Sequence, residues 1–307
     1  MSLVIVGSVA FDAIETPFGK TDKIIGGAGS YIALADSYFG VKPRLISVVG
    51  DDFPKSYLDM LEQKSVDTRG IEICAGEKSF FWAGRYHSNM NQRDTLATEL
   101  NVLAKFDPKI PSDFQNPDFL MLGNLSPEVQ LKVLQRLHKR PKFVALDTMN
   151  FWIEGSPEKL NEVIEQTDAI IINDEEAKML SGEFSLVKAA AKIQAMGPQY
   201  VVIKKGEHGA LLFGDNKVFF APALPILQVY DPTGAGDAFA GGFIGFLAQR
   251  GQANFELMKT AVIAGSVIAS FNVEKFGTER LTELDAAAIN ERFHQFSDLV
   301  RFENFSL

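Results

Sequence analysis

The chain has 307 residues, of which 46% are hydrophobic and 22% are charged, values that are typical of a compact globular protein. This composition excludes a disordered, collagenous or coiled-coil chain. The formal net charge of −9 argues against general binding to a nucleic-acid backbone, which requires a basic surface, but it leaves small anionic ligands open.

The sequence carries no targeting signal and no signal of a structural zinc site or a disulfide scaffold. Cys74 is the single cysteine and cannot form an intrachain disulfide, and the four histidines do not have zinc-ligand spacing. Residues 1–7 lack the basic start of a signal peptide and are typical of a buried strand. The longest apolar run, residues 261–269, is much shorter than the ~20 residues of a membrane span. We therefore expect a cytoplasmic protein without membrane association.

From residue 30 onward, short apolar runs alternate with helical segments. This is the pattern of a parallel sheet with helices on both faces. Ser-Pro-Glu at Ser126 and at Ser156 marks the start of two of these helices. The predicted strands are apolar throughout, as expected for strands buried on both faces: Leu45–Val49, Phe119–Leu122, Phe143–Leu146, Ala169–Ile172 and Tyr200–Ile203. We predict an α/β fold with a central, mostly parallel sheet.

Two segments, about 11–25 and 76–105, interrupt this alternation. Both contain alternating or aromatic-rich runs, such as the run from Ser79 to Tyr86. They predict antiparallel strands outside the main sheet that form a small β lid, and a pair of ordinary hairpins is the alternative. We expect a single domain over residues 1–307 with these lid segments inserted in it.

The segment from Asp231 to Phe243 carries the strongest chemical signal. Gly234 and Gly236 flank Ala235 directly before a helical run, so that successive backbone N–H groups can point at one anion. Asp237 is unexpected beside such a site, because its carboxylate repels an anion. The conflict disappears if Asp237 accepts a proton from a hydroxyl that attacks a bound phosphoryl group. A helix N-cap or first-turn acid is the alternative interpretation.

Two other nucleotide-binding motifs are excluded. A dinucleotide fingerprint requires a glycine three residues after Gly236, where Phe239 stands. The run Gly19-Lys20-Thr21 ends like a P-loop, but Ile14 occupies the position of the required first glycine. We predict a turn there.

The segment Asp231–Gly242 closely resembles the C-terminal signature of the ribokinase-like carbohydrate kinases, the PfkB family. The run Gly26–Ser30 and the helix that follows it resemble the first signature of that family. The length, the order of elements and the lid segments also fit, so the resemblance covers essentially the whole chain. It implies a ribokinase-like fold and ATP-dependent, Mg²⁺-requiring phosphoryl transfer.

The resemblance also implies roles for single residues. Asp237 would be the catalytic base, and the N–H groups of Gly234, Ala235 and Gly236 would stabilise the transferring phosphoryl group. Asn173-Asp174-Glu175-Glu176 matches the family's Asn-x-x-Glu, with an N-cap and a first-turn acid as the alternative. The run from Lys205 to Gly209 resembles the family's Gly-x-x-Gly turn over the nucleotide, with a plain hairpin turn as the alternative. The implied cofactor-binding residues are Asn173, Lys205, Gly206, Gly209, Asn272 and Gly277, and the implied metal-binding residues are Glu176 for Mg²⁺ and Asp231 for a monovalent cation, with K⁺ as a candidate.

For the phosphoryl acceptor, the resemblance implies Asp12, Gly26 and Gly27, and Asn124 is a further candidate of our own. A buried carboxylate needs donors, and the two oxygens of Asp12 could hold two hydroxyl groups. Tyr31 stands where the family usually has an asparagine, so this position departs from the pattern. Further candidates among polar loop and lid residues are Tyr86, Asn89, Asn91, Arg93 and Asn150.

We therefore expect a kinase that phosphorylates a hydroxymethyl group of a small sugar. A nucleoside kinase on the same fold and a catalytically silent ligand-binding homologue are the alternatives. A kinase for a vitamin-like hydroxymethyl heterocycle is a third, which the lid segments disfavour. Two copies of the chain could form a homodimer through the lid.

Overall fold

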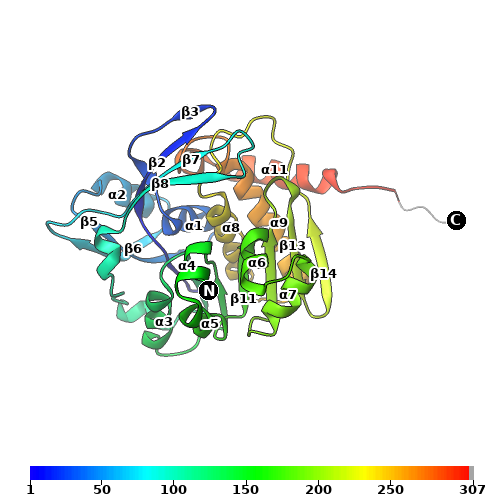
Figure 1. The fold of residues 1–307 in the computed structure, drawn as a ribbon, viewed down its shortest axis with the longest axis horizontal. Coiled ribbons are helices and arrows are strands. Elements are labelled where there is room, and N and C mark those ends of the chain that lie inside the picture. The colour runs from blue at the N-terminus through cyan, green and yellow to red at the C-terminus, as the bar shows by residue number, and fades with distance from the viewer. Residues whose placement is uncertain (304–307) are drawn as a thin grey trace.

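The computed structural model describes residues 1–303. Within this range the main sheet has nine strands in the order β14-β13-β12-β11-β10-β9-β1-β5-β6 (Figure 1). Their bounds are β1 (Leu3–Val6), β5 (Arg44–Gly50), β6 (Asp67–Cys74), β9 (Phe119–Leu122), β10 (Phe143–Leu146), β11 (Ala169–Asn173), β12 (Tyr200–Lys204), β13 (Ala210–Gly214) and β14 (Lys217–Ala221). All neighbours from β6 to β12 pair in parallel, and β13 and β14 continue the sheet as antiparallel strands. The predicted strands and the predicted fold class are confirmed.

Each face of the main sheet has its own hydrophobic core. The first face packs against α1 (Ala28–Ser37), α2 (Lys55–Gln63), α8 (Ala235–Arg250), α9 (Phe255–Asn272), α10 (Glu279–Glu283) and α11 (Ala286–Leu299). The second face packs against α3 (Pro127–Arg136), α4 (Asn150–Gly155), α5 (Pro157–Ile164), α6 (Asp174–Ser181) and α7 (Leu186–Gln194). Leu3 and Ile5 of β1 point into the first core, whereas Val4 and Val6 point into the second. Because successive strand residues alternate between the faces, a strand covered on both sides is apolar throughout.

Helix α8 is buried nearly all round and lies between α1 and α9. A Cβ atom on Gly241 would lie 2.4 Å from the carbonyl oxygen of Ile32 in α1, and one on Gly242 would lie 2.8 Å from that of Ala264 in α9. Only glycine permits this close approach of the three backbones. The packing therefore fixes the position of the α8 N-terminus, which follows the Asp231–Gly234 loop.

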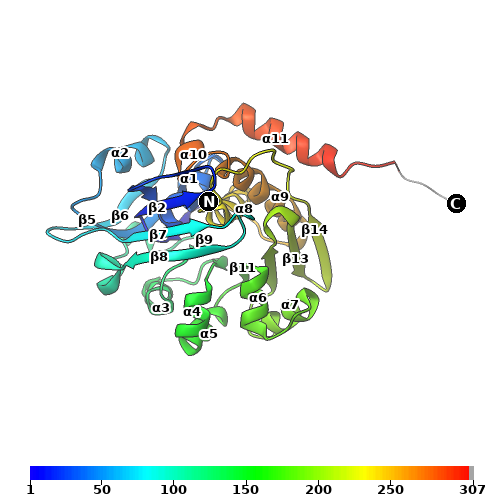
Figure 2. The same cartoon turned by 45° about the horizontal axis from the view of Figure 1, so that its top comes forward.

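A second sheet lies outside the main one. Its strands are β2 (Ala10–Thr16), β3 (Gly19–Lys20), β4 (Ile24–Gly26), β7 (Phe81–Tyr86) and β8 (Arg93–Glu99). Figure 2 shows β2, β7 and β8 side by side, and short 3₁₀ turns follow at Asn101–Lys105 and Ser112–Phe114. The run Gly19-Lys20-Thr21 is part of the β2–β3 hairpin, in agreement with the predicted turn.

The strand directions in this second sheet require one correction. We expected antiparallel strands, but β2 and β7 pair in parallel. The other pairs of this sheet in the described range are antiparallel. Residues that alternate along a strand indicate which face is buried, but they carry no information on the direction of a partner that comes from a distant segment.

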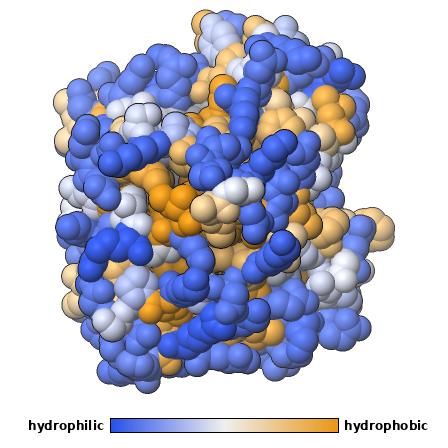
Figure 3. Space-filling view, turned by 90° about the vertical axis from the view of Figure 1, so that its left-hand side faces the viewer, coloured by the Kyte–Doolittle hydropathy of each residue, from blue (hydrophilic) through white to orange (hydrophobic). Residues whose placement is uncertain are grey.

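The surface near the second sheet has a mixed character. Figure 3 shows the face at the left-hand side of Figure 1, where hydrophobic side chains gather near the centre among hydrophilic ones. Strand β8 is an edge strand of the second sheet, and its Leu96 is 51% exposed.

Across residues 1–303, none of the helices has the length and apolar character that crossing a membrane requires.

Candidate active site

Polar side chains gather where the parallel strands of the main sheet end. Asn124 and Asp147 follow β9 and β10, and Asn173 and Lys204 are the last residues of β11 and β12. The Cα atoms of Asn173 and Lys204 are partners in the sheet register. Ligands of open α/β sheets bind outside the carboxyl ends of the strands, so this edge is the first place to search for a site.

The glycine loop before α8 is held in shape by buried polar groups. Asp231 accepts hydrogen bonds from the backbone N–H of Thr233 at 2.8 Å and from that of Gly277 at 2.9 Å. The Asn272 side chain donates to the carbonyl oxygen of Thr233 at 2.8 Å. Burial raises the pKa of Asp231, and the two N–H donors oppose this shift. The structure thus gives Asp231, Asn272 and Gly277 a role in shaping the loop, and their roles toward a cation and a nucleotide stay predictions.

Asp237 lies in the first turn of α8. Within the described residues its Oδ1 atom is enclosed and has no hydrogen-bond partner, and the N-cap position belongs to Gly234. Burial and the neighbouring Asp147 raise the pKa of Asp237 to about 7, while Lys204 and Arg93 oppose the shift. The carboxylate is therefore not used as a helix cap, and near neutral pH it can exchange a proton.

Asn173 and Glu176 form a capping box at the start of α6. The N–H of Glu176 donates to Oδ1 of Asn173 at 2.8 Å, and the N–H of Asn173 donates to Oε2 of Glu176 at 2.8 Å. This is the alternative interpretation of the Asn-x-x-Glu run. Burial raises the pKa of Glu176 to about 7, with Lys204 opposing and Asp147 adding to the shift. The metal role of Glu176 stays a prediction beside its capping role.

Sequence reasoning missed Asp147 and Lys204. Nζ of Lys204 lies 3.4 Å from Oδ1 of Asp147, and the two side chains are 16% and 7% exposed. The available signal was their position, because each comes at the carboxyl end of a predicted strand. We predicted the next lysine, Lys205, instead.

A hollow of about 480 Å³ opens beside the glycine loop. It is lined by Asn89, Met90, Asn91, Lys204, Gly206, Glu207, Gly209, Ala210, Ala223, Leu224, Pro225, Ile226, Val229, Pro232, Ala235, Gly236, Phe239, Ser266, Ala269, Ser270 and Val273. Gly206 and Gly209 belong to the hairpin turn between β12 and β13, which contains a 3₁₀ turn at Gly206–His208. Six residues that the sequence analysis named as candidates are thus brought together, and they are Asn89, Asn91, Gly206, Gly209, Ala235 and Gly236. Other predicted residues of the described range do not line the hollow, and they are Gly234, Asp237, Asn173, Lys205, Asn272 and Gly277.

The lid reaches this hollow through the tip of its β7–β8 hairpin. The Asn91 side chain donates to Oε1 of Glu207 at 3.4 Å. Closer to the glycine loop, the hydroxyl groups of Tyr86 and Thr233 are hydrogen-bonded at 3.1 Å. The second sheet therefore contacts both the β12–β13 turn and the glycine loop.

Asp12 lies on β2 and is buried against the turn that precedes α1. A Cβ atom on Gly26 would lie 1.8 Å from Oδ2 of Asp12, so only glycine leaves room for this carboxylate. Gly27 has a φ of +89°, a conformation that favours glycine, and is the N-cap of α1. Burial raises the pKa of Asp12 to about 7, and the charges of Asp231 and Asp237 add to the shift. Asp12 is therefore electrostatically coupled to the glycine loop.

Two further predicted acceptor residues, Tyr31 and Asn124, differ in whether their polar groups have partners within the protein. Tyr31 is buried beneath the glycine loop, since a Cβ atom on Gly234 would lie 2.4 Å from its ring. Its hydroxyl group has no hydrogen-bond partner among residues 1–303. The Asn124 side chain accepts from Nε1 of Trp152 at 3.0 Å and donates to Sδ of Met149 at 3.1 Å.

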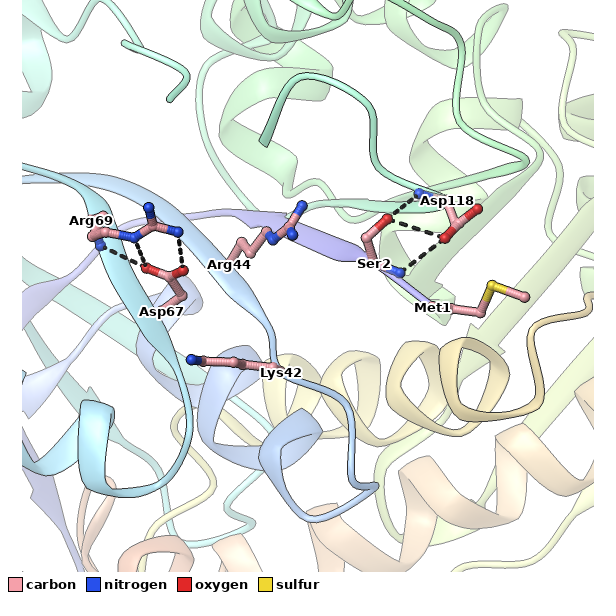
Figure 4. Close-up of a pocket in the computed structure, with 7 residues that line it drawn as sticks. All are labelled: Met1, Ser2, Lys42, Arg44, Asp67, Arg69 and Asp118. Carbon is pink, nitrogen blue, oxygen red and sulfur yellow. Dashed lines mark hydrogen bonds and ion pairs between the residues drawn. The ribbon is translucent and has the colours of Figure 1, made fainter. Parts of the chain in front are cut away.

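A second hollow lies at the opposite edge of the main sheet (Figure 4). It is lined by Met1, Ser2, Lys42, Arg44, Asp67, Arg69 and Asp118, which come before or at the start of β1, β5, β6 and β9. Figure 4 shows Asp118 bound to Ser2, and Asp67 bound to Arg69. None of the predicted site residues in the described part of the chain lines it. The candidate active site is therefore the edge that contains Asp237.

Comparisons with known proteins agree with this arrangement. A family model described as pfkB family carbohydrate kinase matches residues 2–284. A cytidine kinase of Thermococcus kodakarensis is 32% identical over 250 residues, which cover 80% of this chain and 87% of that protein. The crystal structure of the Methanocaldococcus jannaschii nucleoside kinase has a TM-score of 0.76 and 22% identity, and the match covers 96% of this chain and 99% of that one. A fructokinase of Vibrio cholerae O395, in its fructose, ADP and calcium ion bound form, has a TM-score of 0.77 and 19% identity, with 95% and 99% coverage. The chain therefore belongs to the pfkB family of carbohydrate kinases, and it is an ATP-dependent phosphotransferase of sugars or nucleosides with a ribokinase-like fold.

Proposed function

We propose that this kinase transfers a phosphoryl group from ATP to the hydroxymethyl group of a nucleoside. The observation that carries this proposal is the 32% identity to a cytidine kinase over 87% of that protein's length. Tyr31 is consistent with an acceptor other than the family's usual one, because its buried phenol cannot duplicate the amide that meets substrate hydroxyls in the family pattern. The sequence alone favoured a small sugar, and this comparison moves the proposal to the nucleoside.

The proposed chemistry places one side chain at each end of the acceptor. Asp12 accepts hydrogen bonds from two hydroxyl groups of the acceptor, which gives its buried carboxylate the donors that it needs. Asp237 takes the proton of the attacking hydroxyl group, since its pKa of about 7 allows proton exchange near neutral pH. The N–H groups of Gly234, Ala235 and Gly236 bind the transferring phosphoryl group at the N-terminus of α8.

Mg²⁺ fits the charges on this edge of the sheet. The side chains of Asp147, Glu176 and Asp237 are carboxyl groups with raised pKa values, and their charges act on one another. A hard divalent cation would reduce the repulsion between these negative charges. Glu176 and Asn173 would hold Mg²⁺ through its waters, and the ion would neutralise charge on the phosphates of ATP. A monovalent cation such as K⁺ would be held by Asp231 and by carbonyl groups of residues 271–277.

The acceptor is tested by measuring ADP formation with a panel of cytidine, uridine, adenosine, inosine, ribose and fructose, with Mg²⁺ present. We expect the highest kcat/KM with a ribonucleoside. A free sugar whose kcat/KM exceeds that of every nucleoside would overturn the proposal. Turnover with none of them, together with binding of one, would favour a catalytically silent protein. The Asp237→Asn variant serves as the background control.

We also propose that two copies of the chain associate through the second sheet. Within residues 1–303, β8 is an edge strand of the second sheet, and the outer backbone groups of an edge strand are a template for pairing with another strand. The exposed side chain of Leu96 on β8 would be covered in such a dimer.

A further inference from the structure

We propose that Lys204 is a catalytic residue whose ammonium group binds the phosphoryl group during its transfer. This inference rests on the proposed placement of the reaction at Gly234 and the first turn of α8, but it does not depend on which acceptor is used. It is carried by the position of Lys204, by its contact with the glycine loop and by its unused donors.

The backbone aims Lys204 at the reaction site. It is the last residue of β12, and its Cα atom is the register partner of Asn173 at the end of β11. The side chain is 16% exposed and lines the hollow beside the glycine loop. A lysine at the end of a parallel strand thus reaches the place where ligands of this fold class bind.

The ammonium group lies against the first turn of α8, whose N–H groups are proposed to hold the phosphoryl group. A Cβ atom on Gly236 would lie 3.0 Å from Nζ of Lys204. A side chain at position 236 would therefore separate the lysine from the N-terminus of α8. With glycine there, the ammonium group and the backbone N–H groups of the loop can contact the same anion.

Most of the hydrogen-bonding capacity of Lys204 is unused. In the described range the only hydrogen-bond partner of its ammonium group is Oδ1 of Asp147 at 3.4 Å. Charge-assisted bonds of this type are ordinarily about 2.7–2.9 Å long, and an ammonium group has three donors. A lysine that served only to neutralise Asp147 would be held more closely.

The surrounding charge requires a cation at this position. Asp147, Glu176 and Asp237 all act on Lys204. Burial alone would lower the pKa of Lys204, but these three carboxylates raise it above its usual value, so the side chain stays charged. Lys204 thus brings a positive charge into a cluster of three carboxylates, and Arg93 of the second sheet is another cation that acts on Asp237 and Glu176.

The step itself is an ordinary displacement at phosphorus. The acceptor oxygen forms a bond to the γ-phosphorus of ATP, the bond from that phosphorus to the bridging oxygen breaks, and ADP leaves with the electron pair. The proton of the acceptor hydroxyl goes to Asp237. Lys204 transfers no proton and stabilises the negative charge on the phosphoryl oxygens as a point charge.

The test compares nucleotide binding in Lys204→Met with that in Lys42→Met, a control at the opposite edge of the main sheet (Figure 4). Binding of a non-hydrolysable ATP analogue and of AMP is measured by calorimetry without an acceptor, so that a wrong acceptor assignment cannot affect the result. We expect Lys204→Met to weaken binding of the ATP analogue by about 10-fold or more, which corresponds to the loss of one charged hydrogen bond. Binding of AMP should weaken by less than about twofold. Lys42→Met should change neither, and Lys204→Arg should restore part of the affinity. Equal affinities for the analogue in Lys204→Met and the parent would overturn the proposal.

A folding defect is separated from a catalytic one in a second background. Lys204→Met leaves Asp147 buried without its partner, which is strongly destabilising in other proteins. The double variant Asp147→Asn/Lys204→Met is therefore compared with Asp147→Asn alone. If Lys204 only neutralises Asp147, the two have the same analogue affinity and the same kcat, and the proposal is wrong. We expect the double variant to bind the analogue about 10-fold more weakly and to have a lower kcat.

Discussion

Asp237 combines two properties that a base for phosphoryl transfer needs. Its enclosed Oδ1 atom has no hydrogen-bond partner in the described chain, and its pKa is about 7. Asp237→Asn keeps the shape of the side chain but cannot take a proton. We expect kcat to fall on the order of 10²- to 10⁴-fold, with the affinity for an ATP analogue unchanged. In the parent, kcat/KM should fall as the pH drops below about 7, because the carboxylate then becomes protonated. Turnover of Asp237→Asn within a few-fold of the parent would remove Asp237 as the base.

Asp12 is the residue on which the position of the acceptor depends. Asp12→Asn replaces one acceptor oxygen by a donor and removes the charge, which costs about 1.5–3 kcal/mol for a charged hydrogen bond. We expect the KM of the acceptor to rise by about 10-fold or more, with the KM of ATP nearly unchanged. Steady-state kinetics with each substrate varied in turn measure this difference. Tyr31→Phe is the companion variant, and a rise confined to the acceptor KM would show that the phenol contacts the acceptor. An acceptor KM of Asp12→Asn within twofold of the parent would place the acceptor elsewhere.

At the scale of single elements, α6 separates the structural role of Asn-x-x-Glu from its metal role. Asn173→Ala removes the N-cap and should lower the free energy of unfolding by about 1 kcal/mol. Glu176→Gln keeps an oxygen that can accept the N–H of Asn173, so we expect a smaller loss of stability. Because it removes a negative charge, it should raise the Mg²⁺ concentration for half-maximal activity. Urea unfolding and Mg²⁺ titration measure the two effects, and superimposable titrations would leave Glu176 with capping alone.

The contact of α1 with α8 contains a buried carboxyl group, that of Asp36. Both of its oxygens lack partners in the described chain, and burial raises its pKa well above the usual value. The folded state therefore holds a proton that the unfolded state releases above about pH 3.8, so stability is lost as the pH rises toward the folded pKa. We expect Asp36→Ala to raise the free energy of unfolding by about 1–3 kcal/mol at pH 8, and by less at pH 5. Urea unfolding at both pH values, with the exposed Asp22→Ala as control, measures this. An equal change at both pH values would contradict it.

The elements themselves could largely be predicted from the sequence, because burial on both faces makes a strand apolar throughout, as in β9 and β10. The anion-binding loop could also be predicted, since glycine spacing before a helix has a local physical meaning. The positions of Asp147 and Lys204 at the ends of predicted strands were readable, but their pairing was not, because it joins two strands that are far apart in the sequence. The direction of β7 relative to β2 has the same non-local origin.

Association of two copies through the second sheet would be a property of the whole molecule. We expect light scattering after gel filtration to give the mass of a dimer for the parent and that of a monomer for Leu96→Lys, because the added charge would have to be buried in the contact. Phe184→Lys is the matched control, since Phe184 is an exposed hydrophobic residue next to α7, outside the second sheet. A monomeric parent would refute association, and a dimer that persists in Leu96→Lys would place the contact elsewhere.

Asp12 and Asp237 belong to different sheets of the molecule. Asp12 is part of β2 in the second sheet, whereas Asp237 is in α8, which packs on the main sheet. An acceptor that is bound by Asp12 and deprotonated by Asp237 must span the distance between these two side chains. The enzyme would thus select substrates by the distance between their paired hydroxyl groups and the reacting hydroxyl group. An analogue with one extra carbon between these groups would bind, but its reacting hydroxyl group would not be aligned for transfer.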